Sequence, residues 1–290
     1  MSALLQKALD HYHLAMHHAL RYAPVEAASA LAGLLVRANI RFNRPEIIAG
    51  ARRNLTRHRP DMSAQDIDRA IWRFADNVGR HMGECSLIER IFDQGWVEMT
   101  GHGPARSLVG KAPLLFIHLH TGNCEVLGAA LITHGFPVAT FYEPPTSAIQ
   151  RQIIDGVRLR AGLGLLTPDG RGLRAALIRL GGNGVVSIAC DEARAGRLMA
   201  PLFGRRPHDK GNLAIAARLA RRTRAHVVIA HCERLANCRF ALHVGEPLTL
   251  PDPGGGLLED VRFLNERIEP IILSHLDQWY FLDDQIEEIA

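Results

Sequence analysis

The chain has 290 residues, 47% of them hydrophobic and 22% charged, which excludes a disordered protein and predicts a sizeable buried core. The formal net charge is only +4, yet the sequence pI is about 9.0, and Lys occurs at just three positions, so Arg supplies nearly all cations. Arginine suits phosphate and carboxylate oxygens, which favours an anionic partner such as a phospholipid headgroup, a phosphosugar or nucleic acid. A GC-rich genome that encodes Arg in place of Lys explains this bias at least as well.

The cysteines and the apolar runs indicate where in the cell the protein is expected. The five cysteines are scattered without a CxxC pair, which fits neither a disulfide framework nor a zinc site and indicates a reducing cytosol. No secretory signal is recognised in residues 1–21. The sequence also has no uninterrupted apolar run of about 18 residues or more, so a membrane-spanning helix is not expected.

The first 95 residues predict helices only, over residues 2–22, 25–42, 45–56 and 63–92. Ser63 is expected to cap the last of these, with Asp66 three residues later as in a capping box. The apolar segment 25–42 carries Arg37 and Arg41 near its end. That pattern fits a helix lying in a membrane interface or an ordinary core helix about equally well.

Four histidines cluster in the first of these helices, at positions 11, 13, 17 and 18. His13 and His17 are four residues apart, a spacing that metal sites use, but no carboxylate or Cys follows at ligand spacing. The favoured interpretation is therefore a solvated helix face.

From Trp96 onward, short apolar runs alternate with helical stretches. Strands are expected at 114–117, 138–142, 164–166, 185–189, 227–230 and 240–244, and helices at 125–134, 148–161, 172–180, 212–223 and 258–274. This alternation predicts an α/β fold with a mainly parallel central sheet flanked by helices. Residues 1–95 would form a helical N-terminal region docked on a core of residues 96–290. Ligands of such sheets bind beyond the carboxyl ends of the strands.

The stretch 114–127, LLFIHLHTGNCEVL, places His120 and Glu125 at a strand-to-helix turn. His120 could act as a general base on a hydroxyl, while Glu125 could orient the imidazole and stabilise it once protonated. His118 points to the same face two positions earlier, so one of the two histidines could be an ordinary core residue. Cys124 could form a nucleophilic pair with a histidine, although packing is the favoured role for a cysteine at the start of a helix.

The block HTGNCE at His120–Glu125 resembles the hallmark of the bacterial lipid A biosynthesis acyltransferase family. In that family a His is followed after four residues by Asp or Glu, often as HxGNWE. Similar segments extend over about residues 50–280: ARRNL at 51–55, a late helical Glu at 84, Asp-Glu at 191–192 where the family usually has Asp-Gln, PLFG at 201–204 and QW at 278–279.

The resemblance implies an acyltransferase that moves a fatty acyl chain from an acyl-carrier-protein or coenzyme A thioester to a hydroxyl of a glycolipid or lysophospholipid, such as a lipid A-like acceptor. It implies no cofactor, no metal and no nucleic-acid partner. His120 would be the base and Glu125 its partner, and backbone N–H groups near Asn123, or Arg158, would stabilise the oxyanion. The expected substrate-binding residues are Asn123, Arg158, Arg160, Arg171 and Asp191.

Three residues depart from the family pattern: Cys124 stands for Trp, Glu143 for Arg and Glu192 for Gln. Glu143 places an anion near the expected acceptor pocket, which argues against the usual lipid A acceptor. Without a spanning helix, the protein is expected to be cytoplasmic and attached peripherally to the inner membrane through segment 25–42, or to be soluble. Two alternatives remain open: a lipid-binding or regulatory homologue without catalysis, and a hydrolase that releases free acid through Cys124 or His120.

Overall fold

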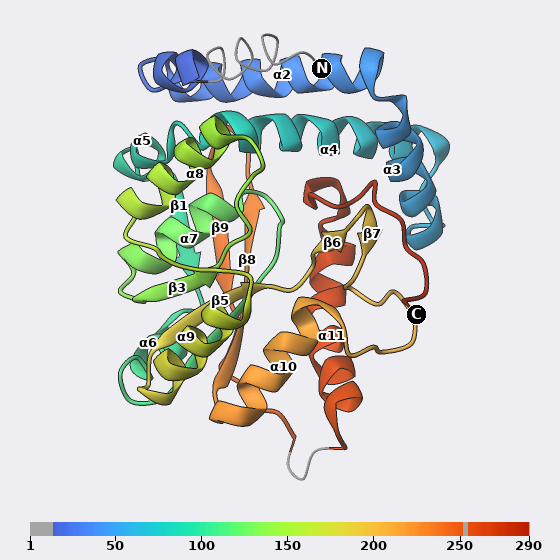
Figure 1. Cartoon of the computed structure of the whole chain (residues 1–290). Coiled ribbons are helices and arrows are strands. Elements are labelled where there is room, and N and C mark those ends of the chain that lie inside the picture. The colour runs from blue at the N-terminus through green and yellow to red at the C-terminus, as the bar shows by residue number, and fades with distance from the viewer. Residues whose placement is uncertain (1–13, 252–254, 290) are drawn as a thin grey trace.

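The structure, a computed structural model, describes residues 14–251 and 255–289. Its centre is a seven-stranded sheet of order β1-β9-β8-β2-β5-β3-β4 (Figure 1). All neighbouring pairs are parallel except β8 and β9, so the predicted α/β fold with a mainly parallel sheet is confirmed. The strands are β1 Val97–Thr100, β2 Leu114–His118, β3 Val138–Phe141, β4 Gly164–Leu166, β5 Val185–Ala189, β8 His226–Arg234 and β9 Phe240–Val244.

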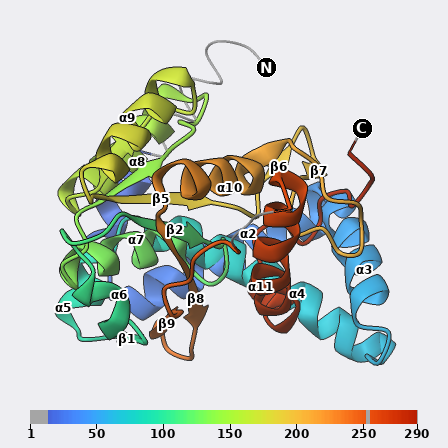
Figure 2. The same cartoon turned by 90° about the horizontal axis from the view of Figure 1, so that it is seen from below.

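Helices cover both faces of this sheet. They are α2 Val25–Asn43, α3 Pro45–His58, α4 Ala64–Glu84, α5 Ile88–Asp93, α6 Gly103–Ser107, α7 Cys124–Thr133, α8 Ala148–Arg160, α9 Gly170–Gly181, α10 Gly211–Thr223 and α11 Leu257–Ser274, followed by the 3-10 turn η1 Leu276–Gln278. Residues 14–20 are also helical. Figure 2 shows α10 on one side of β2 and β5, and α7 on the other.

Strand β2 divides the hydrophobic core in two because successive side chains point to opposite faces. Leu114 and Phe116 pack in a cluster with residues of α7, whereas Leu115 and Ile117 pack in a cluster with residues of α9, α10 and α11. The strand is buried on both faces and reads as a continuous apolar run, as expected for a central parallel strand.

Helices α2 and α4 form a layer at one end of the sheet (Figure 1). In this layer α4 lies between the outer helix α2 and the rest of the molecule. Helices α2 and α4 cross closely, since a Cβ atom on Gly79 would lie 2.6 Å from the carbonyl oxygen of Ala32. Ser63 caps α4 as predicted, accepting a hydrogen bond from the Asp66 N–H at 3.2 Å. The division of the chain at residue 95 stays a prediction.

The sequence predicted one helix over residues 63–92, but the structure has two. Helix α4 ends at Glu84, and α5 begins at Ile88. The break redirects the chain: Phe74 of α4 packs in the cluster with α10 and α11, whereas Leu87 and Ile91 pack in the other cluster with α7. One straight helix could not place side chains in both hydrophobic clusters.

Several short elements were not predicted: β1, α6, η1, and the strands β6 Ala193–Arg194 and β7 Arg197–Leu198. The edge strand β1 was missed because only Met99 is buried in its four residues, so no apolar run marks it. The hairpin of β6 and β7 is too short to show an alternating pattern.

The predicted histidine cluster is only partly within the described residues, since His11 and His13 lie outside them. His18 is exposed, but His17 is buried and its Nδ1 lies 2.7 Å from Ser86 Oγ. The prediction of a solvated face is therefore wrong for His17, because the first helix packs against the segment between α4 and α5. Within the part of the chain that the structure describes, none of the helices has the length and apolar character needed to cross a bilayer.

Candidate active site

The predicted catalytic histidine lies at the carboxyl end of β2, beside the end of β5. The two strands are parallel neighbours in which His118 stands opposite Ala189. Two residues further along each chain, in the same register, come His120 and Asp191. The pairing of the two strands thus brings together residues that are 71 positions apart in sequence.

Asp191 holds His120 through two hydrogen bonds. Its Oδ1 lies 2.8 Å from the ring Nδ1 of His120, and its Oδ2 accepts the backbone N–H of the same residue at 2.7 Å. An ionised carboxylate only accepts, so Nδ1 carries the proton and Nε2 is left with the lone pair. Asp191 is fully buried, which keeps this geometry shielded from water.

The local charges fit a basic imidazole. Burial alone would lower the pKa of His120, but the Asp191 carboxylate outweighs it and raises that pKa above its usual value. The pKa of Asp191 is lowered, because the contacts with His120 outweigh its burial. His118 differs: burial, followed by the repulsion of His120, lowers its pKa to about 3, and its Nδ1 lies 2.7 Å from Ser187 Oγ. His118 is thus a neutral, hydrogen-bonded histidine of the cavity wall.

The C-terminal segment also binds both His120 and Asp191. Trp279 is fully buried, and its indole N–H donates to Oδ2 of Asp191 at 3.0 Å. The backbone of the segment also pairs with the histidine loop, since the Tyr280 N–H donates to the carbonyl of His120 at 2.9 Å and Thr121 forms a bridge with Trp279. Sequence reasoning noted the QW pair only as part of a resemblance. It gave no sign that the indole would bind Asp191.

The structure places Glu125 differently from the prediction that it orients His120. Its two carboxylate oxygens accept hydrogen bonds from Nε and Nη2 of Arg158, at 2.9 and 2.6 Å. The partner of His120 Nδ1 is Asp191 instead, because β5 carries that carboxylate to the end of β2. Burial would raise the pKa of Glu125, but Arg158 outweighs it, so the pKa is lowered and the carboxylate is ionised. The guanidinium carbon of Arg158 also lies 4.3 Å from the centre of the Tyr142 ring, a cation–π contact.

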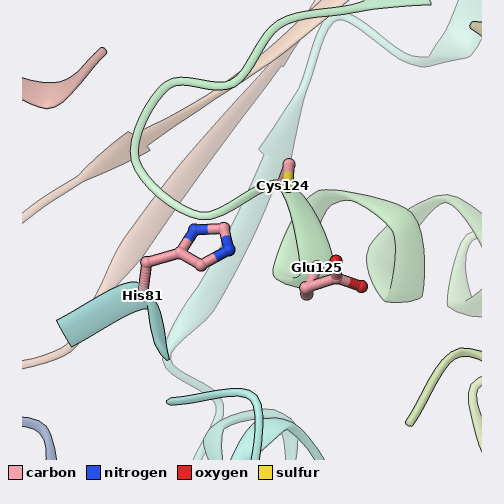
Figure 3. A group of neighbouring side chains, drawn as sticks. All are labelled: His81, Cys124 and Glu125. Atoms are coloured by element: carbon pink, nitrogen blue, oxygen red, sulfur yellow. The ribbon is translucent and has the colours of Figure 1, made fainter. Parts of the chain in front are cut away.

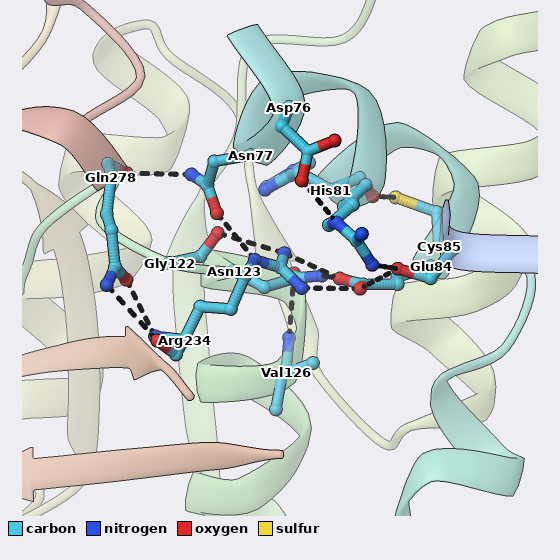
Figure 4. Close-up of polar contacts among 12 residues, drawn as sticks. Asp76, Asn77, His81, Glu84, Cys85, Gly122, Asn123, Val126, Arg234 and Gln278 are labelled. Carbon is cyan, nitrogen blue, oxygen red and sulfur yellow. Dashed lines mark hydrogen bonds and ion pairs between the residues drawn. The ribbon is translucent and has the colours of Figure 1, made fainter. Parts of the chain in front are cut away.

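A buried polar network fixes the turn that follows His120 (Figure 4). Asn123 caps α7, where its side-chain oxygen accepts the N–H groups of Glu125 and Val126, and its Nδ2 donates to Glu84 at 2.8 Å. Glu84 in turn accepts from Nη2 of Arg234 at 2.7 Å and from Ser29 Oγ at 2.7 Å. Asn123 is fully buried, and its side-chain oxygen and nitrogen are both bonded within the protein. In this structure its side chain stabilises the turn after His120.

The position of Gly122 in the motif leaves no room for a side chain. Gly122 has a φ of +57°, and a Cβ atom there would lie 2.6 Å from the carbonyl oxygen of Cys232. Its N–H donates to the carbonyl of Gln278 at 3.1 Å, which joins the histidine loop to the C-terminal segment again. A larger residue would push the loop away from β8.

A cavity of about 840 Å³ opens beside these groups. His120, Glu125 and Arg158 lie in its wall, together with Glu143 and Glu192. Residues of α7, β3 and the position before β4 also line it, and their side chains are apolar: Leu127, Leu131, Val138 and Leu163, next to Gly128. The cavity thus combines a polar part around His120 with apolar space that could hold a hydrocarbon chain.

Two of the predicted substrate-binding arginines lie outside the wall of this cavity. Arg160 is bonded to Glu89 at 2.8 Å and lines a second, smaller cavity of about 270 Å³. Arg171 is 88% exposed and pairs with Asp169 at 3.1 Å. The sequence placed both near the site because it shows which helix bears a residue and not which way the residue faces.

Three side chains of metal-binding type lie near one another, namely His81, Cys124 and Glu125, with ligand atoms within 4.8 Å (Figure 3). Both oxygens of Glu125 are already bound by Arg158, whose positive charge repels a cation. Burial raises the pKa of the Cys124 thiol well above its usual value, so this sulfur is protonated and is neither a good ligand nor a nucleophile. We therefore assign no metal to these residues.

Comparison with known proteins agrees with the chemistry of this site. A base held by a buried carboxylate, a nearby guanidinium and an apolar cavity fit acyl transfer, and the family model described as bacterial lipid A biosynthesis acyltransferase matches residues 2–287. A search of curated proteins found no match to the chain. Because the family match covers nearly the whole length, the chain belongs to the bacterial lipid A biosynthesis acyltransferase family.

Proposed function

We propose that the protein transfers a fatty acyl chain from an acyl-carrier-protein or coenzyme A thioester to a hydroxyl of a glycolipid or lysophospholipid. The main support is the contact between His120 and Asp191, which leaves a basic nitrogen at the wall of a partly apolar cavity. The family is one of acyltransferases, which agrees with this chemistry.

In the proposed reaction, Nε2 of His120 takes the proton of the acceptor hydroxyl as its oxygen attacks the thioester carbonyl carbon. The negative charge of Asp191 stabilises the imidazolium that forms. When the tetrahedral intermediate collapses, the carbon–sulfur bond breaks and the imidazolium returns the proton to the leaving thiolate. His120 ends the cycle neutral.

Arg158 is the proposed source of oxyanion stabilisation. A guanidinium has five N–H donors, and Glu125 accepts from two of its nitrogens, so further N–H groups are left for the developing negative charge. Glu125 then acts by fixing the guanidinium, and Tyr142 supports it from its ring face. This assigns Glu125 a positioning role in place of the direct contact with His120 that the sequence predicted.

The apolar part of the cavity is the proposed site of the acyl chain. Gly128 lies close to another residue of the cavity wall, since a Cβ atom there would lie 3.0 Å from Cδ1 of Leu163. Gly128→Leu is expected to fill this space and to shift the preferred donor to shorter acyl chains, with kcat/KM for a long chain falling at least about tenfold relative to a short one. The measurement is competition between acyl thioesters of graded length.

Ala129→Leu is the matched control, because it adds bulk to the next position of α7, which lines the smaller cavity instead. Equal donor preferences in the two variants would contradict the assignment of the acyl site.

Helix α2 is the proposed contact with the cytoplasmic surface of the inner membrane. It lies on the outside of the molecule (Figure 1), and it exposes large apolar side chains: Leu31, Leu34, Leu35 and Phe42. Arg41 lies on the same helix and is exposed, so it would face anionic headgroups, whereas Arg37 lies 3.9 Å from Asp76 of α4. Exposed apolar residues with nearby arginines are typical of a helix that lies in a membrane interface.

Leu31→Glu combined with Leu34→Glu is expected to weaken binding to vesicles that contain anionic phospholipid by at least about tenfold. The double substitution removes apolar surface that the membrane would bury, and it adds negative charges that the lipid headgroups repel. Sedimentation with vesicles measures this. Ile178→Glu on α9 serves as the control, since Ile178 is exposed but lies on a different helix. Similar losses for both variants would count against α2 as the membrane contact.

The function can be tested in cells by mass spectrometry of total lipids with the wild-type gene and with a His120→Ala gene. We expect one lipid to lose an acyl group in the variant. A lipid profile that does not change would favour the alternative of a binding or regulatory protein, and free acid formed without an acceptor would favour a hydrolase.

A further inference from the structure

Glu192 is an acidic residue of the cavity wall that the proposed reaction does not use. It follows Asp191 after β5, and its side chain is only 13% exposed. Its Oε1 accepts the backbone N–H of Asn212 at 2.6 Å, at the start of α10. Its Oε2 is buried and has no hydrogen-bond partner among residues 14–251 and 255–289. A buried carboxylate oxygen without a donor is unfavourable, so the carboxylate has capacity for a donor that a ligand would bring.

The charges of the cavity wall also constrain the ligand. Four carboxylates but only two guanidinium groups lie in the wall, counted over the described residues: Glu125, Glu143, Asp169 and Glu192, with Arg158 and Arg194. The Arg158 guanidinium is bound by both oxygens of Glu125. Arg194 is 54% exposed and lies 3.5 Å from Oε1 of Glu192.

A phosphate on the acceptor would therefore meet an acidic wall. Asp169 is turned to its own helix, where it caps α9 and pairs with Arg171. The charges left to act on an incoming headgroup are then the two carboxylates of Glu143 and Glu192 and the guanidinium of Arg194. Like charges repel strongly in a partly buried site, whereas hydroxyl and ammonium groups can donate to the carboxylates.

We propose that Glu192 positions the acceptor by accepting a hydrogen bond from a hydroxyl or ammonium group of its headgroup, and that Glu192 and Glu143 together select against a phosphorylated headgroup. This inference depends on the proposed acyl transfer and narrows its acceptor from a glycolipid or lysophospholipid to a glycolipid without a phosphate. Burial raises the pKa of Glu192 to about 7, so the repulsion of a phosphate by this residue applies above that pH, and a donor supplied by the ligand would favour the ionised form.

The substitution Glu192→Gln separates the ligand's contact from the support of α10. Glutamine keeps one side-chain oxygen, which can still accept the Asn212 N–H. It replaces the other oxygen with an NH₂ group, which donates and removes the negative charge. A purely structural role would thus survive the change, and a role in accepting a donor from the ligand would not.

The experiment uses the full chain with an acyl coenzyme A donor and three diacylglycerol acceptors in mixed micelles, which carry glucose, glucosamine or glucose 6-phosphate. Wild type is expected to use the first two with kcat/KM at least about tenfold above that of the third. Glu192→Gln is expected to raise KM for the preferred acceptor about tenfold, the effect of losing one charged hydrogen bond, while kcat stays within about twofold. The control Glu246→Gln changes an exposed carboxylate outside the cavity and should leave both constants unchanged.

The outcomes separate this inference from the proposed function. Equal or better use of the phosphorylated acceptor, or an unchanged KM in Glu192→Gln, would overturn the role of Glu192 and leave acyl transfer standing. Transfer to none of the three acceptors would overturn this inference, and undiminished transfer by His120→Ala would overturn the proposed reaction alone. A preference for glucosamine over glucose would identify the donor to Glu192 as an ammonium group, and the reverse preference a hydroxyl.

Discussion

Asp191→Asn is expected to lower the rate of acyl transfer by about 10³-fold or more while the protein stays folded. The asparagine NH₂ group would face Nδ1 of His120, where the structure has an accepting oxygen at 2.8 Å. The imidazole would then place its proton on Nε2 and lose the nitrogen that acts as base. Steady-state rates with an acyl thioester and an acceptor measure the loss.

The pH dependence gives this variant a second readout. In wild type the pKa of His120 is raised by Asp191, so kcat/KM should increase with pH through a midpoint above 6.5, the ordinary value for histidine. Removing the carboxylate lowers that pKa, so the midpoint of the residual activity should move to lower pH. A midpoint that does not move would show that Asp191 does not act through His120.

Asp277→Asn provides the control for this substitution. Asp277 lies in η1 of the same C-terminal region but pairs with Arg73 at 2.6 Å. It is only partly buried and does not line the cavity, which predicts normal turnover and a normal pH profile.

Glu84→Ala is expected to lower the free energy of unfolding by about 3–5 kcal/mol. Glu84 is fully buried and bonded to Arg234, Asn123 and Ser29, so its loss leaves a guanidinium buried without its carboxylate. The network also supports the turn after His120 (Figure 4), so activity should fall with stability. Urea denaturation monitored by tryptophan fluorescence measures the change.

Two comparisons make this result specific. Glu89→Ala removes an exposed carboxylate that is bonded to Arg160 at 2.8 Å, and it should cost less than about 1 kcal/mol. Glu84→Leu combined with Arg234→Met should cost less than Glu84→Ala alone, since no buried charge is left unpaired. Equal destabilisation by Glu84→Ala and Glu89→Ala would contradict the importance of the buried network.

The fold could be predicted from local patterns because its central strands are buried on both faces. Strands β4, β5 and β9 were predicted with the bounds that the structure gives, since each is a short apolar run between turn residues. The failures occurred where a local pattern is weak or where tertiary packing decides the outcome. Strand β1 has one buried side chain, and the break between α4 and α5 depends on two core clusters that no single segment reveals.

The candidate site was predicted only in part, because its contacts join distant segments. The motif around His120 identified the loop, but not that Asp191 would face Nδ1, which follows from the pairing of β2 with β5. Likewise the indole of Trp279 reaches Asp191 across 88 positions of sequence. The pairing of Glu125 with Arg158 required the relative placement of α7 and α8, which sequence spacing does not give.

The most direct test of the account is the rate of acyl transfer by purified His120→Ala, measured with donor and acceptor both saturating. We expect a loss of at least about 10² in kcat, with the fold retained and unchanged binding of the acyl thioester, because the substitution removes the base. Turnover close to that of wild type would contradict it and would require another group to take the proton of the acceptor.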